Sequence, residues 1–136
     1  MKIVLDTNVF ISGVFFKGPP YQILRAWRDG RIRILMSEEI FLEYQRVGEQ
    51  LANDFPDIDL VPFLELLSIN TEYVIPKKLQ SPVCDDADDD KFIACALSGK
   101  SNIIISGDKH LLRVSGYKGI KVLRPRKFMD EYLDSR

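Results

Sequence analysis

Short apolar runs, rich in β-branched residues, alternate along the chain with segments whose apolar residues recur every three or four positions. Runs of the first kind are typical of strands buried on both faces of a parallel sheet, and segments of the second kind are typical of amphipathic helices. Strands are expected at residues 3–5, 31–36, 73–75, 103–105 and 120–123. The alternation predicts an α/β fold with three α/β/α layers around a central parallel sheet.

Helix signals fill the intervals between these strands. The turn-forming residues Asp6-Thr7-Asn8 indicate a helix directly after the first strand, and Pro19-Pro20 suits the first turn of a second helix that ends at Gly30. Ser37 is the predicted N-cap of a third helix. Further helices are expected at residues 60–67, 87–98, 111–112 and 128–133. Gly99 is expected to end the helix 87–98 as a left-handed C-cap.

Length and composition limit the alternatives. The 136 residues, 46% of them hydrophobic, are enough for one domain covering residues 1–136. Nineteen basic and 20 acidic side chains give a net charge of −1, so the total charge predicts no general attraction to nucleic acid or membrane. Two cysteines make neither a disulfide framework nor a zinc site. Without a leader pattern or a run of about 18 apolar residues, a cytoplasmic protein with no membrane contact is expected.

Acidic residues stand at corresponding points of the pattern. Asp6 follows the first apolar run, Asp108 follows the run 103–105, and the stretch 86–90 carries four aspartates at the mouth of a helix. Ligands of parallel sheets gather at the carboxyl ends of the strands, so Asp6 and Asp108 are expected to meet there, with Glu43 and Asp90 leaning over from helices. Crowded oxygen ligands favour a hard cation such as Mg²⁺ or Mn²⁺.

Each acid also has a structural interpretation. Asp6 is suited to capping the following helix, Glu43 to a solvated helix surface, and Asp108 to a turn with Gly107. Within the aspartate cluster, a structural role such as capping is expected for Asp86 and Asp89, the role of Asp88 stays open, and Asp90 is the expected functional acid.

Three motifs in this order and spacing resemble the PIN domain family, in particular the VapC-like toxins of toxin–antitoxin pairs. They are Val4-Leu5-Asp6-Thr7-Asn8-Val9-Phe10-Ile11-Ser12, Asp88-Asp89-Asp90-Lys91-Phe92-Ile93-Ala94-Cys95-Ala96-Leu97 and Ile105-Ser106-Gly107-Asp108-Lys109-His110-Leu111-Leu112. A glutamate of the family matches Glu43. The resemblance covers nearly the whole chain and implies the PIN-like fold of 5′-nucleases.

The resemblance implies a Mg²⁺- or Mn²⁺-dependent endoribonuclease that cleaves phosphodiester bonds with metal-activated water. Its catalytic and metal-binding residues would be Asp6, Glu43, Asp90 and Asp108, with Asp88 as a further candidate ligand and Thr7, Asn8 and Ser106 in support. RNA would be the substrate, Lys91 and Lys109 being candidates for contacting its phosphates. The resemblance also implies an antitoxin partner and a homodimer.

Three other functions compete with this interpretation. A phosphohydrolase of the haloacid dehalogenase class needs a second aspartate two residues after Asp6, where this chain has Asn8. A receiver-like regulatory domain needs an acidic pair at the end of the first strand, where only Asp6 stands. A non-catalytic module that binds metal or RNA with a PIN-like fold remains the alternative to a ribonuclease.

Overall fold

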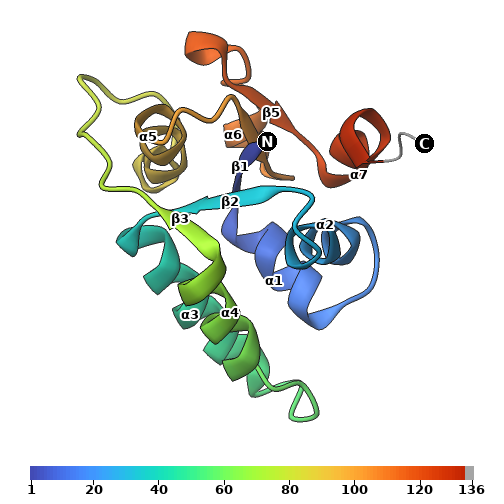
Figure 1. Cartoon of the computed structure of the whole chain (residues 1–136). Helices are drawn as coiled ribbons and strands as arrows, with labels where there is room; N and C mark the ends of the chain where they lie inside the picture. Colours follow the sequence, from blue (N-terminus) through green and yellow to red (C-terminus); the bar gives the residue numbers. More distant parts are fainter. Residues whose placement is uncertain (134–136) are drawn as a thin grey trace.

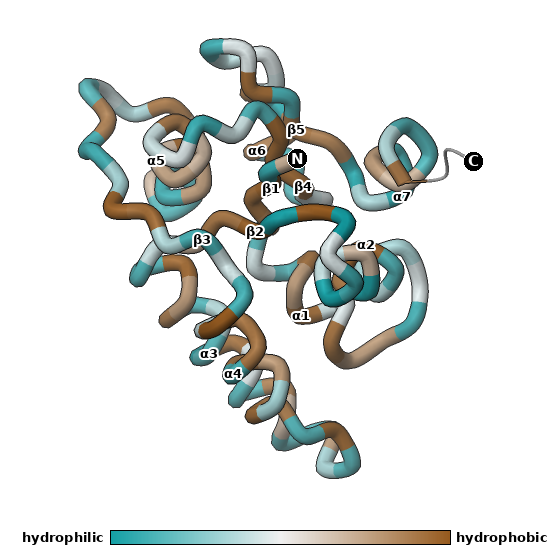
Figure 2. Tube along the Cα trace, in the orientation of Figure 1, coloured by the Kyte–Doolittle hydropathy of each residue, from teal (hydrophilic) through white to brown (hydrophobic). Residues whose placement is uncertain are grey.

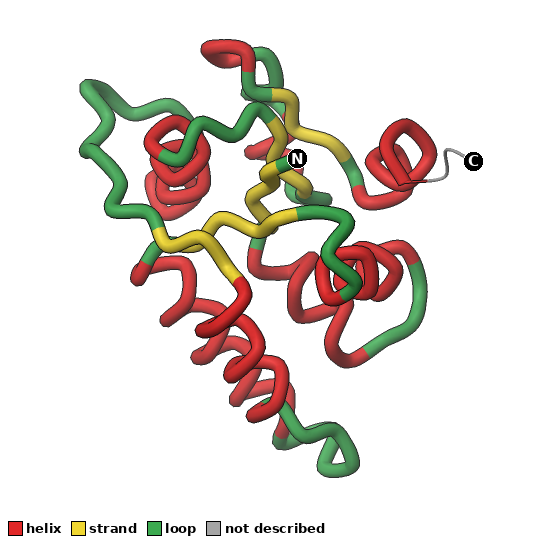
Figure 3. The backbone as a smooth tube through the Cα atoms, in the orientation of Figure 1, coloured by secondary structure: helices red, strands yellow, loops and turns green. Residues whose placement is uncertain are grey.

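A five-stranded, all-parallel sheet forms the centre of the molecule (Figures 1 and 3). The computed structural model describes residues 1–133. The sheet order is β3-β2-β1-β4-β5, so β1 and β4, which the sequence separates by about a hundred residues, are neighbours at its middle. The strands are β1 (Lys2–Leu5), β2 (Arg33–Met36), β3 (Thr71–Tyr73), β4 (Ile103–Ile105) and β5 (Lys121–Leu123).

Helices connect the strands as the alternating pattern predicts. Gly30 follows the second helix with a φ of 82°, and the Ser37 side chain accepts a hydrogen bond from the Ile40 amide, so both predicted helix boundaries are confirmed. The helices are α1 (Thr7–Phe15), α2 (Pro19–Arg28), α3 (Glu38–Ala52), α4 (Val61–Asn70), α5 (Asp90–Ser98), α6 (Lys109–Leu112) and α7 (Pro125–Phe128), with single 3₁₀ turns at Ala87–Asp89 and Tyr117–Gly119 and a π-helical turn at Met129–Leu133.

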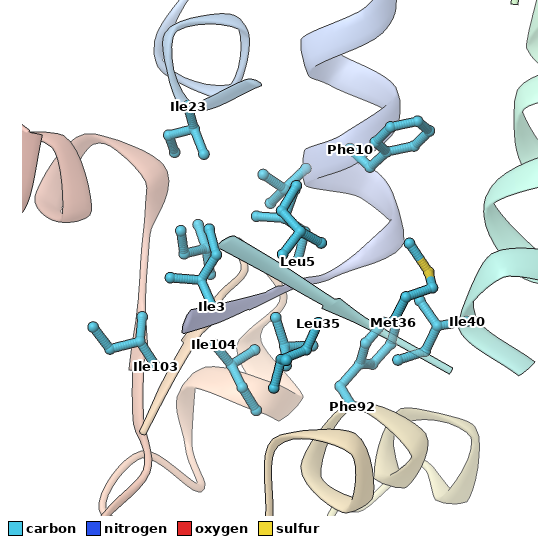
Figure 4. Packing of buried hydrophobic residues seen from close by; sticks show 14 of the residues in the cluster. Ile3, Leu5, Phe10, Ile23, Leu35, Met36, Ile40, Phe92, Ile103 and Ile104 are labelled. Carbon is cyan, nitrogen blue, oxygen red and sulfur yellow. The ribbon is translucent and has the colours of Figure 1, made fainter. Parts of the chain in front are cut away.

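Side chains from both sides of the sheet build the core. Phe10 of α1 and Ile23 of α2 approach the strands from one side, and Phe92 of α5 approaches from the other (Figure 4). All three are almost completely buried. The central strands are largely hydrophobic and lie between these layers (Figure 2). The arrangement is the predicted three-layer α/β/α fold.

Two local predictions were wrong. The third strand lies at Thr71–Tyr73, two residues before the predicted 73–75, because its register is set by pairing with Ile34–Met36, and Ile75 is 95% exposed. Gly99 has a φ of −88° and is not left-handed. A Cβ there would stand 2.4 Å from the Leu35 side chain, so close packing of α5 on the sheet explains this glycine.

Within residues 1–133, no helix has the length and apolar character needed to cross a membrane.

Candidate functional site

Asp6 and Asp108 meet at the carboxyl edge of the two central strands. Leu5 pairs with Ile105 in the sheet, and Asp6 and Ser106 follow these partners. The Ser106 hydroxyl donates to Asp6 Oδ2 at 2.7 Å and accepts from the Asp108 amide at 2.9 Å. Asp6 occupies the N-cap position of α1 but makes no side-chain capping hydrogen bond, so its buried carboxylate is directed to the strand edge instead.

Asp108 has a structural role as well. Its carboxylate accepts from the His110 amide at 2.8 Å and so caps α6. This bond fixes the side chain at the same edge as Asp6, where its negative charge acts on its neighbour. Burial raises the pKa of Asp6, the Ser106 hydroxyl opposes this shift, and the charges of Asp108 and Glu43 add to it.

Glu43 comes to the site from α3. The buried Tyr44 next to it donates its hydroxyl to the Leu5 carbonyl, which fastens α3 to the end of β1. Thr7, the first residue of α1, donates its hydroxyl to Glu43 Oε2. Glu43 is near enough to Asp6 for its charge to act on that carboxylate, and the hydroxyls of Thr7 and Ser106 bond the carboxylates of Glu43 and Asp6.

Asp89 is an acid of the aspartate cluster on which the charges of Asp6 and Asp108 act. It ends the 3₁₀ turn before α5 and is 9% exposed. Desolvation raises its pKa to about 6, and the negative charges of Asp108, Asp6 and Asp86 contribute to the shift. The sequence interpretation gave Asp89 a structural role. The electrostatic coupling instead joins it to the two strand-end acids.

Asp90 is held differently from the sequence prediction. Its carboxylate accepts hydrogen bonds from the amides of Cys84 at 2.7 Å and Val83 at 3.3 Å, so it closes the loop before α5. Burial and the Asp90 carboxylate also raise the pKa of the Cys84 thiol to about 12. Asp90 lines a cavity of about 480 Å³ between the segment Pro76–Pro82 and α5, whose lining does not include Asp6 or Asp108.

The Lys91 side chain is buried, so it is not accessible to an RNA phosphate as the sequence interpretation expected. Its ammonium lies 2.6 Å from Glu43 Oε1 and 2.9 Å from Asp88 Oδ2. Burial by itself would lower the pKa of Lys91, but the two carboxylates outweigh it and the pKa is raised. Lys91 in turn lowers the pKa of Asp88. Asp88 therefore serves as a partner of a lysine.

The remaining predicted residues lie at the surface. Asn8 and Lys109 are exposed. His110, in the last motif, has its Nδ1 3.6 Å from an Asp85 oxygen, and Arg113 contacts the same carboxylate at 3.2 Å. Asp86 caps the 3₁₀ turn through the Asp88 amide, as its structural interpretation predicts.

Comparison with known proteins identifies the family. The family model described as PIN domain matches residues 2–110, a span that contains all of the acids above. The chain belongs to the PIN domain family. It is also 29% identical to the uncharacterized protein MJ1680 of Methanocaldococcus jannaschii, over 97% of this chain and 92% of that protein. PIN domains are generally metal-dependent nucleases, which makes this chain a member of a nuclease superfamily.

A divalent metal fits this PIN domain in its chemistry. Within residues 1–133, no three acidic, histidine or cysteine side chains form a ready-made metal cage. The donors at the strand edge are nevertheless all oxygens, and the charge of Asp108 raises the pKa of both Asp6 and Asp89. Repulsion of this kind is relieved when a hard cation binds.

The burial of Asp89 and the negative charges around it predict that Asp89→Asn stabilises the metal-free PIN domain at neutral pH. A carboxyl whose folded-state pKa of about 6 exceeds its ordinary value of 3.8 stabilises the fold below pH 3.8, and this contribution is lost as the pH rises through 6. The neutral amide avoids that loss. Urea unfolding in EDTA should give a gain of roughly 1–3 kcal/mol at pH 7.5 and almost none near pH 4.

Asp57→Asn is the matched control, because Asp57 is an exposed aspartate in the loop after α3. Its stability difference from the wild type should be small at both pH values. A loss of stability in Asp89→Asn at pH 7.5 would contradict the proposed proximity of Asp89 to the other acids.

Proposed function

We propose that this PIN domain, comprising residues 1–136, is a Mg²⁺- or Mn²⁺-dependent endoribonuclease of the cytoplasm and the toxin of a toxin–antitoxin pair. Its metal-binding acids are Asp6, Asp89 and Asp108, with Asp89 in the place for which the sequence favoured Asp90. One observation carries the proposal. The carboxylate of Asp6 lies buried at a strand edge without a side-chain capping bond, and burial, with the charge of Asp108 adding to it, raises the pKa of Asp6 and that of Asp89.

The residues of the site would have different roles in phosphodiester hydrolysis. A divalent cation, when bound, supplies a water of lowered pKa and neutralises charge on the leaving oxygen. Ser106 fixes one oxygen of Asp6, and the capping bond of Asp108 fixes a second carboxylate at the same edge. Asp89 adds a third from the helical side. This preorganisation holds the acids in place before the metal arrives, so little reorganisation is needed during the reaction.

The toxin role rests on the resemblance of the motifs, and one surface supports it. Leu42, Tyr73 and Ile75 are more than half exposed and, with Glu38 and Glu39, line a groove of about 460 Å³ beside β3. An apolar groove rimmed by acids suits an amphipathic, basic segment of an antitoxin. The homodimer stays a prediction of the resemblance.

The proposal predicts that the purified, metal-stripped protein cuts RNA only when Mn²⁺ or Mg²⁺ is added. A 5′-labelled single-stranded RNA should yield internal cuts, EDTA should stop them, and DNA of the same sequence should stay intact. Expression of the active protein should slow growth, and Asp6→Asn should relieve this effect. Intact RNA in the presence of folded, metal-loaded protein would contradict the nuclease proposal and favour a binding module. Equal growth defects from wild type and Asp6→Asn would contradict the toxin role.

A further inference from the structure

Lys91 stands inside the acidic site with all of its hydrogen-bonding capacity in use. Its side chain is 4% exposed. The ammonium has three N–H donors, and three oxygens surround it, namely Glu43 Oε1 at 2.6 Å, Asp88 Oδ2 at 2.9 Å and the Asp88 carbonyl at 2.9 Å. A buried lysine with three oxygen partners is a fixed cation, since moving it away from them would leave its charge buried and unpaired.

The carboxylate of Glu43 is occupied on both sides. Oε1 is bonded to Lys91 and lies 3.9 Å from the Arg46 guanidinium, while Oε2 accepts from the Thr7 hydroxyl. Two positive side chains therefore surround one acid. A dication placed on the same oxygen would be repelled by an ammonium at close range in a partly buried site, where charges are weakly screened.

We propose that Lys91 is a built-in cation that occupies the place of a second metal ion, with Glu43 and Asp88 as its ligands. The site then takes a single divalent ion, on Asp6, Asp89 and Asp108, and Glu43 acts as the anchor of Lys91. This inference rests on the proposed metal-dependent function. Lys91 is a positioning residue, because it acts on the site through Glu43 and does not contact the reacting atoms.

Isothermal titration of the metal-stripped full chain with Mn²⁺ tests the proposal without relying on activity. The wild type should bind one ion per chain. Lys91→Met keeps a long apolar side chain beside Phe92 but removes the charge, so a second, weaker ion should bind. Adding Glu43→Gln to Lys91→Met should abolish that second site. Lys121→Met, which removes an exposed lysine from β5, is the matched control and should still bind one ion.

A second variant keeps the test decisive if Lys91→Met fails to fold. Glu43→Gln in the wild-type background retains an oxygen for Lys91, and its Mn²⁺ affinity should stay within about threefold of the wild type, whereas Asp6→Asn should lose more than about tenfold. Three results would overturn the inference and leave the nuclease proposal standing. They are two bound ions in the wild type, one bound ion in folded Lys91→Met, and a tenfold loss of Mn²⁺ affinity in Glu43→Gln. Folded wild type that binds no Mn²⁺ would contradict both.

Discussion

Asp89→Asn is expected to lower the rate of RNA cleavage about a thousandfold at saturating Mn²⁺, while Asp90→Asn keeps most of the activity. The two carboxylates are adjacent in sequence but differ in what they touch. Asp89 shares its electrostatic environment with Asp6 and Asp108, and Asp90 is bonded to the backbone amides of Val83 and Cys84. Initial rates on a fluorescent single-stranded RNA would measure kcat/KM for both variants and the wild type.

The neighbouring variant provides the control for this comparison. Asp90→Asn keeps a neutral acceptor for one of the two backbone amides and places an NH₂ donor against the other, so it should lower the free energy of unfolding by about 1–2 kcal/mol without removing a proposed metal ligand. If folded Asp90→Asn were inactive and Asp89→Asn active, the sequence prediction of Asp90 as the catalytic acid would be restored.

Phe10→Ala should lower the free energy of unfolding by about 3–5 kcal/mol. Phe10 is fully buried, and its ring stacks on Tyr44 with centroids 4.5 Å apart and planes 11° from parallel. The pair joins α1 to α3, the two helices that carry Thr7 and Glu43 to the site. Removing the ring leaves a cavity between them. Urea denaturation followed by circular dichroism would measure the loss.

Phe16 offers a matched phenylalanine at the end of α1. It is 48% exposed and touches Phe55 edge-on, so Phe16→Ala should cost about 1 kcal/mol or less. Equal losses from Phe10→Ala and Phe16→Ala would mean that the packing of α1 on α3 contributes little to stability.

The fold could be predicted from sequence where one periodicity dominates a segment. The central strand Ile103–Ile105 and the capped start of α3 at Ser37 agree with prediction, because a buried apolar run and an N-cap are local signals. The edge strand was misplaced since Tyr73, Val74 and Ile75 look like a strand by composition. Register depends on the partner strand, which sequence reasoning does not supply.

The candidate site was predictable as a set of acids but not acid by acid. Asp6 and Asp108 could be chosen as site candidates because each follows an apolar run that predicts a strand. The carboxyl ends of parallel strands lie at one edge of a sheet, so the two acids were expected to be close together. The proposal of Asp89 in place of Asp90 depends on the surroundings of two adjacent side chains in the tertiary structure. Helical spacing does not separate them, because Asp89 is three residues before the buried Phe92 and Asp90 is three residues before the buried Ile93.

Lys91 was misjudged for a different physical reason. A lysine in a motif with many acids was expected at the surface, because lysine is almost never fully buried unless it is paired. The pairing partner Glu43 lies on another helix, 48 positions away in sequence, and the contact exists only in the tertiary structure. Sequence spacing alone shows the local Asp88 partner three residues before it.

The central claim is that three carboxylates from two strand ends and one helix bind a single divalent ion. A crystal structure of the Mn²⁺-soaked protein, with anomalous difference density, tests it most directly. We expect one peak per chain, bounded by Asp6, Asp89 and Asp108, with Lys91 still bonded to Glu43. A peak bound by Glu43 and Asp90, or no peak at saturating Mn²⁺, would contradict it.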